Sequence, residues 1–187
     1  EFPAYISDLN GKLIKRFGKT ERYFPAINSR HHRRFFLEMT TDEKILAVCS
    51  DEPVIEWYDL EGNFLKDYCL IDIQPIKDYF QYVEKMQRSD EGKRLHCMFI
   101  AESLVQNSRL YLLLVSFDES QYEEGKRTGR FCSDILELEI EDVEINPVRI
   151  ISLMYENSKT FYYAFTIVEE GLIGYDIIRN EIHEYEL

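Results

Sequence analysis

Lys44-Ile-Leu-Ala-Val-Cys-Ser50 begins a segment that continues to Leu70 and predicts a series of short strands. The run is almost wholly apolar and too short for an ordinary helix, so it predicts a strand that is buried on both faces. Asp51-Glu52-Pro53 interrupts the run, because proline cannot donate to a strand ladder. The next run, Val54 to Leu60, is rich in β-branched and aromatic residues and predicts a second strand.

A tight turn follows at Asp59-Leu60-Glu61-Gly62, because an Asp side chain can accept from the backbone two residues on and Gly readily adopts positive φ. The frame Asp-Leu-x-Gly-x-apolar-apolar-Lys occurs at Asp8–Lys15 and again at Asp59–Lys66. A degenerate third copy is Asp176-Ile-Ile-Arg-Asn180, where Asn can replace Gly at positive φ. Repeats of about 40 to 50 residues built from short strands are typical of β-propeller blades. The alternative is unrelated hairpins that share common turn chemistry.

The fold class predicted is all-β, with blades of four antiparallel strands in a single domain, residues 1–187. The expected blades are a partial one at 1–17 and fuller ones at 34–70, 95–154 and 160–187. One inserted helix is expected near 75–87, because apolar residues there recur at helical spacing on one face. In the second four-stranded unit, Leu136, Leu138 and Ile140 alternate with glutamates, which predicts an exposed outer strand with its acidic side chains in solvent.

The number of predicted blades raises a question about closure. The pattern gives a little over three blades, whereas closed propellers usually have about four to eight. Three explanations remain open: the chain is the C-terminal part of a larger propeller, two copies form one ring as a homodimer, or the strands form an open sheet or sandwich. The first is favoured, because the chain begins partway through a blade.

Composition restricts the class of partner. The formal net charge is −13, which argues against nucleic acids and anionic membrane surfaces, since both require a basic footprint. No apolar run is long enough for a membrane span. Four cysteines occur without a CxxC pair, so buried free thiols are expected. The partners left are a small molecule, a glycan or a protein.

Val54-Ile-Glu-Trp-Tyr-Asp-Leu-Glu-Gly-Asn-Phe-Leu-Lys66 resembles the outer hairpin of the six-bladed β-propeller proteins of gut bacteria, of the TolB-like or NHL-like type. The segment from Gly174 to Leu187 is similar to their last blade. The resemblance extends over most of the chain at the level of blades, although the chain has about half the blades of such a ring. It implies ligand or partner binding and a cell-envelope location, often as a lipoprotein, and it implies no particular mechanism.

One basic cluster, Arg30-His31-His32-Arg33-Arg34, precedes a predicted inner strand. Its candidate ligand-binding residues are Arg30, His32, Arg33 and Arg34, which could hold a carboxylate, a phosphate or an acidic sugar. The alternative is a solvated loop whose charges offset nearby acidic groups. Neighbouring His31 and His32 would point to opposite faces of a strand, so no metal site is predicted here.

No catalytic residues and no cofactor are predicted, because nucleophile-elbow, phosphate-loop and dinucleotide signatures are missing from the sequence. Trp57 and Tyr58 could stack on sugar rings, but packing between blades is the favoured interpretation. The expected function is therefore a non-catalytic binding or interaction module. The alternatives are a metal-dependent hydrolase or lactonase with its site in the propeller channel, and a purely structural component.

Overall fold

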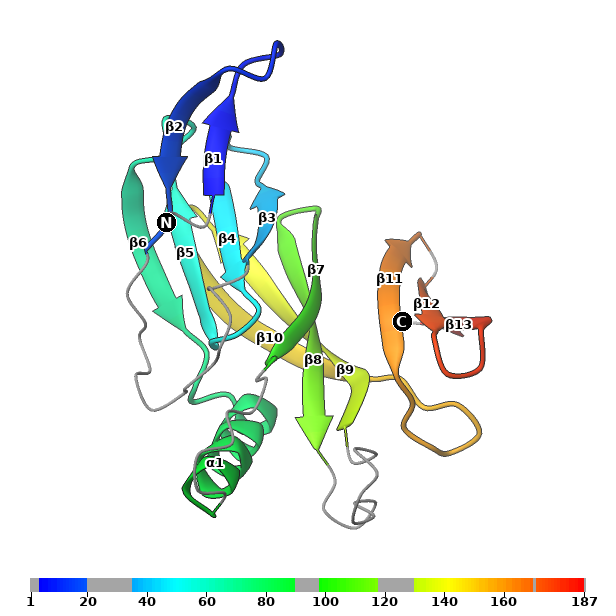
Figure 1. Cartoon of the computed structure of the whole chain (residues 1–187). Helices are drawn as coiled ribbons and strands as arrows, with labels where there is room; N and C mark the ends of the chain where they lie inside the picture. Colours follow the sequence, from blue (N-terminus) through cyan, green and yellow to red (C-terminus); the bar gives the residue numbers. More distant parts are fainter. Residues whose placement is uncertain (1–3, 20–34, 90–97, 118–129, 170, 187) are drawn as a thin grey trace.

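The computed structural model describes residues 4–19, 35–89, 98–117, 130–169 and 171–186. Within them the chain forms four antiparallel sheets of two to four strands and one helix, which confirms the all-β class with a single inserted helix (Figure 1). The hairpin at the start pairs β1 (Ala4–Ser7) with β2 (Leu13–Phe17). The helix α1 spans Gln74–Ser89, so the predicted segment is helical and is longer by one residue at its start and by two at its end.

The other strands follow in chain order, each paired with the next strand in its own sheet. The first four-stranded sheet contains β3 (Phe35–Met39), β4 (Ile45–Cys49), β5 (Val54–Tyr58) and β6 (Phe64–Cys69). The second contains β7 (Ile100–Gln106), β8 (Arg109–Phe117), β9 (Arg130–Glu141) and β10 (Glu144–Ser152). The last sheet contains β11 (Tyr162–Val168), β12 (Gly171–Asp176) and β13 (Glu181–Glu186).

The repeated turn has the same hydrogen bonds in both copies. The Asp59 amide donates to the Asn63 carbonyl at 3.1 Å, and the Asp8 amide donates to the Lys12 carbonyl at 3.0 Å. The Asp59 carboxylate accepts from the Asn63 amide at 2.7 Å, and the Asp8 carboxylate accepts from the Lys12 amide at 2.8 Å. The glycine that closes each turn has positive φ. The sequence repeat is therefore a structural repeat of one hairpin.

The third copy shares the turn chemistry but lies elsewhere in its sheet. The Asp176 carboxylate accepts from the Ile178 amide at 2.8 Å, and Asn180 has a φ of 58°, as the frame predicts. However, this turn joins β12 to β13, the second and third strands of the last sheet, whereas the Asp59 turn joins the third and fourth strands of its sheet.

The three larger sheets contact one another chiefly through their first strands, and β11 also contacts β9. The first strand of the second sheet, β7, contacts the first strands of both neighbouring sheets, β3 and β11. The hydroxyl of Ser103 on β7 donates to the Glu38 carboxylate on β3 at 2.6 Å. The fourth strands, β6 and β10, are joined by the ion pair Lys66–Glu144.

Two pairs of backbone hydrogen bonds recur at equivalent places. The Val115 amide donates to the Phe99 carbonyl at 2.9 Å in the second sheet, and the Ile177 amide donates to the Phe161 carbonyl at 3.2 Å in the last. Likewise, the amide that follows the fourth strand donates to a carbonyl near the start of the third strand in both four-stranded sheets. These bonds are from Leu70 to Pro53 and from Leu153 to Ser133. The sheets are therefore variants of one unit, and the strands β11–β13 correspond to the first three strands of that unit.

The first four-stranded sheet contributes to two apolar clusters, one on each face. Leu46, Val48 and Trp57 belong to the main core, which continues through α1 and the second sheet. Ala47 and Tyr58 belong to a smaller cluster with the hairpin β1–β2. Because Trp57 and Tyr58 are both buried, the packing interpretation is confirmed. The thiols of Cys49 and Cys132 are buried as expected, but Cys69 is exposed.

The expectation that β9 is an exposed outer strand is wrong. The strand lies between β8 and β10, and Glu137 is buried. Its carboxylate accepts from Arg109 on β8 and from Arg149 on β10, the latter at 2.6 Å. Burial by itself would raise the pKa of Glu137, but the hydrogen bonds from the two arginines outweigh burial and lower it. Alternation alone does not reveal such flanking cations.

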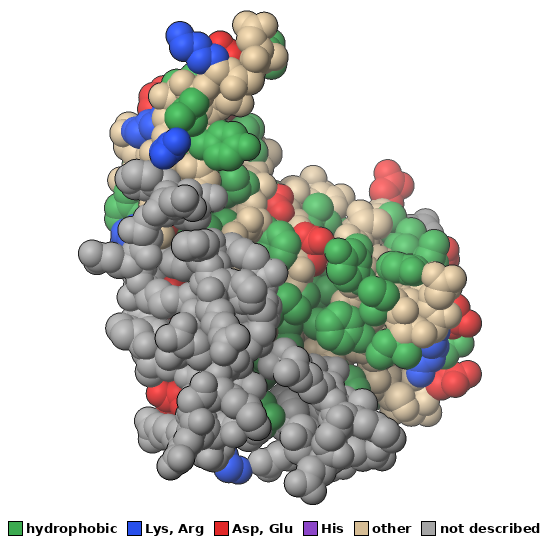
Figure 2. All heavy atoms as spheres, viewed as in Figure 1, with side chains coloured by type: hydrophobic (Ala, Val, Ile, Leu, Met, Phe, Trp, Pro, Cys, Tyr) green, Lys and Arg blue, Asp and Glu red, His purple; other side chains and the backbone are tan. Residues whose placement is uncertain are grey.

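The hairpin and the last sheet, which have fewer than four strands, expose large apolar side chains. Tyr5, Leu9 and Ile14 are exposed on the hairpin, and Ile178 and Ile182 on the last sheet. Figure 2 shows hydrophobic side chains on the projecting hairpin and over the middle of the same face. No helix in the described ranges is long and apolar enough to cross a membrane.

The repeated turn provides a matched test of the packing between hairpin and sheet. A Cβ added at Gly62 would lie 3.3 Å from both Ile6 and Phe17, whereas one at Gly11 would meet nothing within 4 Å. Both glycines have positive φ, so Gly11→Ala should cost about 1 kcal/mol of unfolding free energy from backbone strain alone. We expect Gly62→Ala to cost a further ~1–3 kcal/mol from overpacking, measured by urea denaturation. Equal losses would show that the hairpin does not pack against this turn.

Candidate functional site

A cleft of about 340 Å³ lies between α1 and the second sheet. This volume is near the lower end of the range for small-molecule pockets, about 300 to 1,000 Å³. Its walls combine aromatic, hydroxyl, carboxylate, amide and ammonium groups that come from well-separated parts of the chain. The lining residues are Gln74, Pro75, Asp78, Tyr79 and Tyr82 on the helix side, and Ser116, Asp134, Ile150, Ser152 and Lys159 on the other.

The helix wall presents an aromatic face and a polar pair. Tyr79 and Tyr82, one helical turn apart, stack with ring centroids 6.3 Å apart and planes 19° apart. Tyr79 is buried and packs edge-on against Phe99 at 5.1 Å, which fixes its ring, whereas Tyr82 is only half-buried. On the previous turn, the Gln74 amide donates to the Asp78 carboxylate at 2.7 Å.

The opposite wall is organised around the buried carboxylate of Asp134. Asp134 on β9 is paired in register with Ser152 on β10, so the serine hydroxyl donates to the carboxylate at 2.7 Å. Lys159, from the connection between β10 and β11, donates to the other carboxylate oxygen at 2.6 Å. The Lys159 side chain is 37% exposed, and an ammonium has three N–H donors, so it retains donors for a second partner.

One hydroxyl at the cleft has no hydrogen-bond partner among the described residues. Ser116, near the end of β8, lines the cleft, and its Oγ atom is buried. A buried hydroxyl left unpaired costs about 1–3 kcal/mol, so a small rotation of this side chain toward a ligand hydroxyl would be favourable. The cleft thus offers a donor–acceptor pair on each wall, with an unpaired hydroxyl beneath its lining.

Two other hollows occur among the described residues. One of about 310 Å³ contains Asp42 and Asp142, but Lys44 bridges their carboxylates. Another, of about 780 Å³, lies along β12 and β13 of the last sheet and includes Glu184 and Tyr185, and its residues all come from that one sheet. Within the described ranges, no group of three or more His, Cys, Asp or Glu side chains could hold a metal ion.

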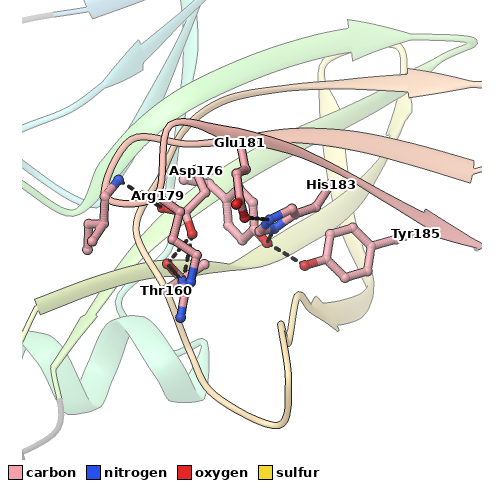
Figure 3. A network of polar contacts seen from close by, with 8 residues as sticks. Thr160, Asp176, Arg179, Glu181, His183 and Tyr185 are labelled. Carbon is pink, nitrogen blue, oxygen red and sulfur yellow. Dashed lines mark hydrogen bonds and ion pairs between the residues drawn. The ribbon is translucent and has the colours of Figure 1, made fainter.

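A second polar cluster lies inside the last sheet (Figure 3). The Tyr162 hydroxyl lies 2.7 Å from Nδ1 of His183 and also hydrogen-bonds the Tyr185 hydroxyl. Nε2 of His183 lies 3.2 Å from the Glu181 carboxylate, and the His183 ring stacks on Tyr155 with centroids 4.0 Å apart. If Nε2–H is donated to Glu181, Nδ1 accepts from Tyr162, which in turn accepts from Tyr185.

The network in the last sheet suits a structural role better than a reactive one. Tyr162 is fully buried, and this burial is the main reason that the pKa of its hydroxyl is raised. The hydrogen bond with Tyr185 raises the pKa further. A phenol with a raised pKa remains a hydrogen-bond donor and is a poor nucleophile. The cluster therefore positions the last sheet and the connection that carries Tyr155.

Beside this network, Asp176 fixes the turn between β12 and β13. Its buried carboxylate accepts from the Thr160 hydroxyl at 2.6 Å and from the Arg179 guanidinium at 2.7 Å (Figure 3). Burial alone would raise the pKa of Asp176, but these hydrogen bonds, with two from backbone amides, lower it. Arg179 also lies over the Tyr155 ring, 4.9 Å from its centroid.

The residues predicted from the basic cluster, Arg30, His32, Arg33 and Arg34, lie outside the described residues. The residues of the cleft were not predicted as a site. The helical spacing of Gln74, Asp78 and Tyr82 places polar and aromatic groups on one side of a helix, and this was the available signal. Asp134 and Lys159 carry no such signal, because strand pairing and a chain connection bring them together.

Comparison of the chain with protein-family models and with curated proteins gave no match.

The buried Asp176 carboxylate predicts an acid-labile last sheet. Because hydrogen bonds lower its pKa in the folded state, its stabilising contribution is present above the unfolded-state pKa, about 3.9, and is lost as pH falls through the folded-state value. Asp176→Asn should lower stability at pH 7 by about 1–3 kcal/mol and flatten its loss in acid, measured by urea denaturation from pH 7 to pH 3. Asp142→Asn, at an exposed carboxylate, serves as the control. If Asp176→Asn loses as much unfolding free energy between pH 7 and pH 3 as the unaltered chain does, this role is contradicted.

The tyrosine–histidine network predicts unequal costs for two similar changes. Tyr162→Phe removes the hydroxyl that joins His183 and Tyr185 and should cost about 1–3 kcal/mol, because both partners lose a hydrogen bond in a buried setting. Tyr185→Phe removes only the last hydroxyl of this series of hydrogen bonds, at a half-buried residue, and should cost less. Thermal denaturation of both variants makes the comparison, and an equal or reversed order would mean that Tyr162 is not the central member.

Proposed function

We propose that this chain is a non-catalytic binding module whose sheets pack as blades of a β-propeller, with the ligand held in the cleft between α1 and the second sheet. The cleft is the single observation that carries the proposal. It brings Tyr82, Lys159 and the buried Asp134 carboxylate to one hollow, although they come from three separate parts of the chain. Such convergence of polar groups beside an aromatic ring is typical of ligand sites.

The packing of the sheets supports the propeller part of the proposal. In a propeller, neighbouring blades place inner strands beside inner strands and outer strands beside outer strands around an axis. Here β7 contacts β3 and β11, while the outermost strands β6 and β10 share an ion pair. The family to be tested is the six-bladed TolB-like or NHL-like propellers of gut bacteria, and with it a place in the cell envelope.

The pairing of the polar groups favours binding over catalysis. Asp134 is held by Ser152 and Lys159, and Asp78 by Gln74, so each carboxylate already accepts from a fixed donor. General acid–base chemistry needs a group that is free to exchange a proton with the substrate. Paired groups are instead suited to orient a ligand by hydrogen bonds.

The test is a thermal-shift screen against libraries of metabolites, glycans and peptides, repeated with one cleft variant and one matched control. Lys159→Met should abolish the shift produced by a bound compound, because it removes the cationic donor of the cleft. Lys66→Met should leave the shift intact, since Lys66 is also a half-exposed lysine in an ion pair, but on β6. A compound that gives the same shift in both variants binds elsewhere. If every binding compound behaves in this way, the cleft is not the ligand site.

A further inference from the structure

Resting on the proposed binding function, we infer that the cleft recognises a neutral sugar ring, that is, a monosaccharide or a terminal unit of a glycan. Three properties of the cleft lead to this class of ligand: paired donors and acceptors, an aromatic wall, and a charge balance that disfavours anions. Each follows from contacts among the described residues.

The first property is the pairing of a donor with an acceptor on both walls. Gln74 and Asp78 form such a pair on the helix, and Lys159 and Asp134 form one opposite. Adjacent hydroxyls on a sugar ring match these pairs, because each hydroxyl both donates and accepts. One hydroxyl can donate to the carboxylate while its neighbour accepts from the amide or ammonium.

The second property is the aromatic wall. Tyr82 is half-buried at the cleft and is held nearly parallel to the fixed ring of Tyr79. A pyranose has one face of C–H groups that packs on such a ring, while its hydroxyls point outward to polar partners. Pro75 and Ile150 add apolar surface to the lining. An entirely polar ligand such as inorganic phosphate would leave this surface unused.

The third property is charge. Among the described residues, the titratable groups of the lining, apart from the tyrosines, are the carboxylates of Asp78 and Asp134 and the ammonium of Lys159. With one cation against two anions, and a chain of net charge −13, the cleft repels a further carboxylate or a phosphate. This balance selects a neutral sugar over a uronic acid or a sugar phosphate.

The experiment is isothermal titration calorimetry of the full chain with neutral hexoses and disaccharides, glucuronate, glucose 6-phosphate and inorganic phosphate. At least one neutral sugar should bind with a Kd in the millimolar range or tighter, and its acidic counterpart should bind more weakly. A deoxy analogue that lacks one of two adjacent hydroxyls should bind about tenfold more weakly, which corresponds to the loss of one hydrogen bond. Tighter binding of the acidic compounds would overturn the inference.

Variants place the sugar in the cleft. Tyr82→Ala should weaken binding about tenfold and Tyr82→Phe much less, because phenylalanine keeps the stacking surface. Gln74→Ala should also weaken binding, and because Gln74 is exposed this variant has no folding defect to obscure the result. Lys66→Met should bind like the unaltered chain. Sugar binding that is indifferent to the Tyr82 and Gln74 changes would overturn the assignment to this cleft.

The calorimetry separates this inference from the proposed function. If a compound of another class binds and Lys159→Met abolishes its binding, the cleft is a ligand site but the sugar assignment is wrong. If no compound responds to changes in the cleft, both the sugar assignment and the proposed function fail.

Discussion

The structure depends on the burial of the first four-stranded sheet on both of its faces. Its central strands are apolar on each side, so Leu46 and Val48 face one cluster while Ala47 faces the other. A sheet of this kind is stable only when each face is covered by another layer. The second sheet with α1 covers one face, and the hairpin β1–β2 covers the other through Phe17. The sequence therefore requires successive sheets to stack. The cleft is a consequence, because α1, which follows the first sheet in the chain, lies below the sheets and packs against β8 of the second sheet (Figure 1).

Local patterns predicted the elements well because each signal lies within a few neighbouring residues. The turn at Asp59 and Gly62, the helix around Tyr79 and the strand at Lys44–Ser50 all depend on nearby chemistry, and all appear as expected. Properties that depend on which strands become neighbours were not predictable in this way. Glu137 has the spacing of a solvent-facing residue, but arginines on both adjacent strands allow its burial.

The candidate site was hidden for the same reason. Its residues lie on a helix, three strands and a connection, and no short motif joins them. Asp134 and Ser152 become neighbours through register, and Lys159 reaches them because the last sheet fixes where the connection from β10 ends. The basic cluster around Arg33 gave the stronger sequence signal and lies outside the described residues.

The connection between β10 and β11 joins two regions that otherwise have separate roles. Tyr155, near its start, stacks on His183 of the last sheet, and Lys159, near its end, reaches into the cleft. A local opening of the last sheet that also broke the hydrogen bond from the Cys132 amide to the Thr160 carbonyl would release this connection and withdraw the ammonium from Asp134. By thermodynamic linkage, a ligand whose binding depends on Lys159 must then disfavour this opening of the last sheet. The free energy of opening rises with the logarithm of the free ligand concentration. Ligand binding in the cleft would thus slow amide hydrogen exchange in β11–β13, although the ligand need not contact that sheet.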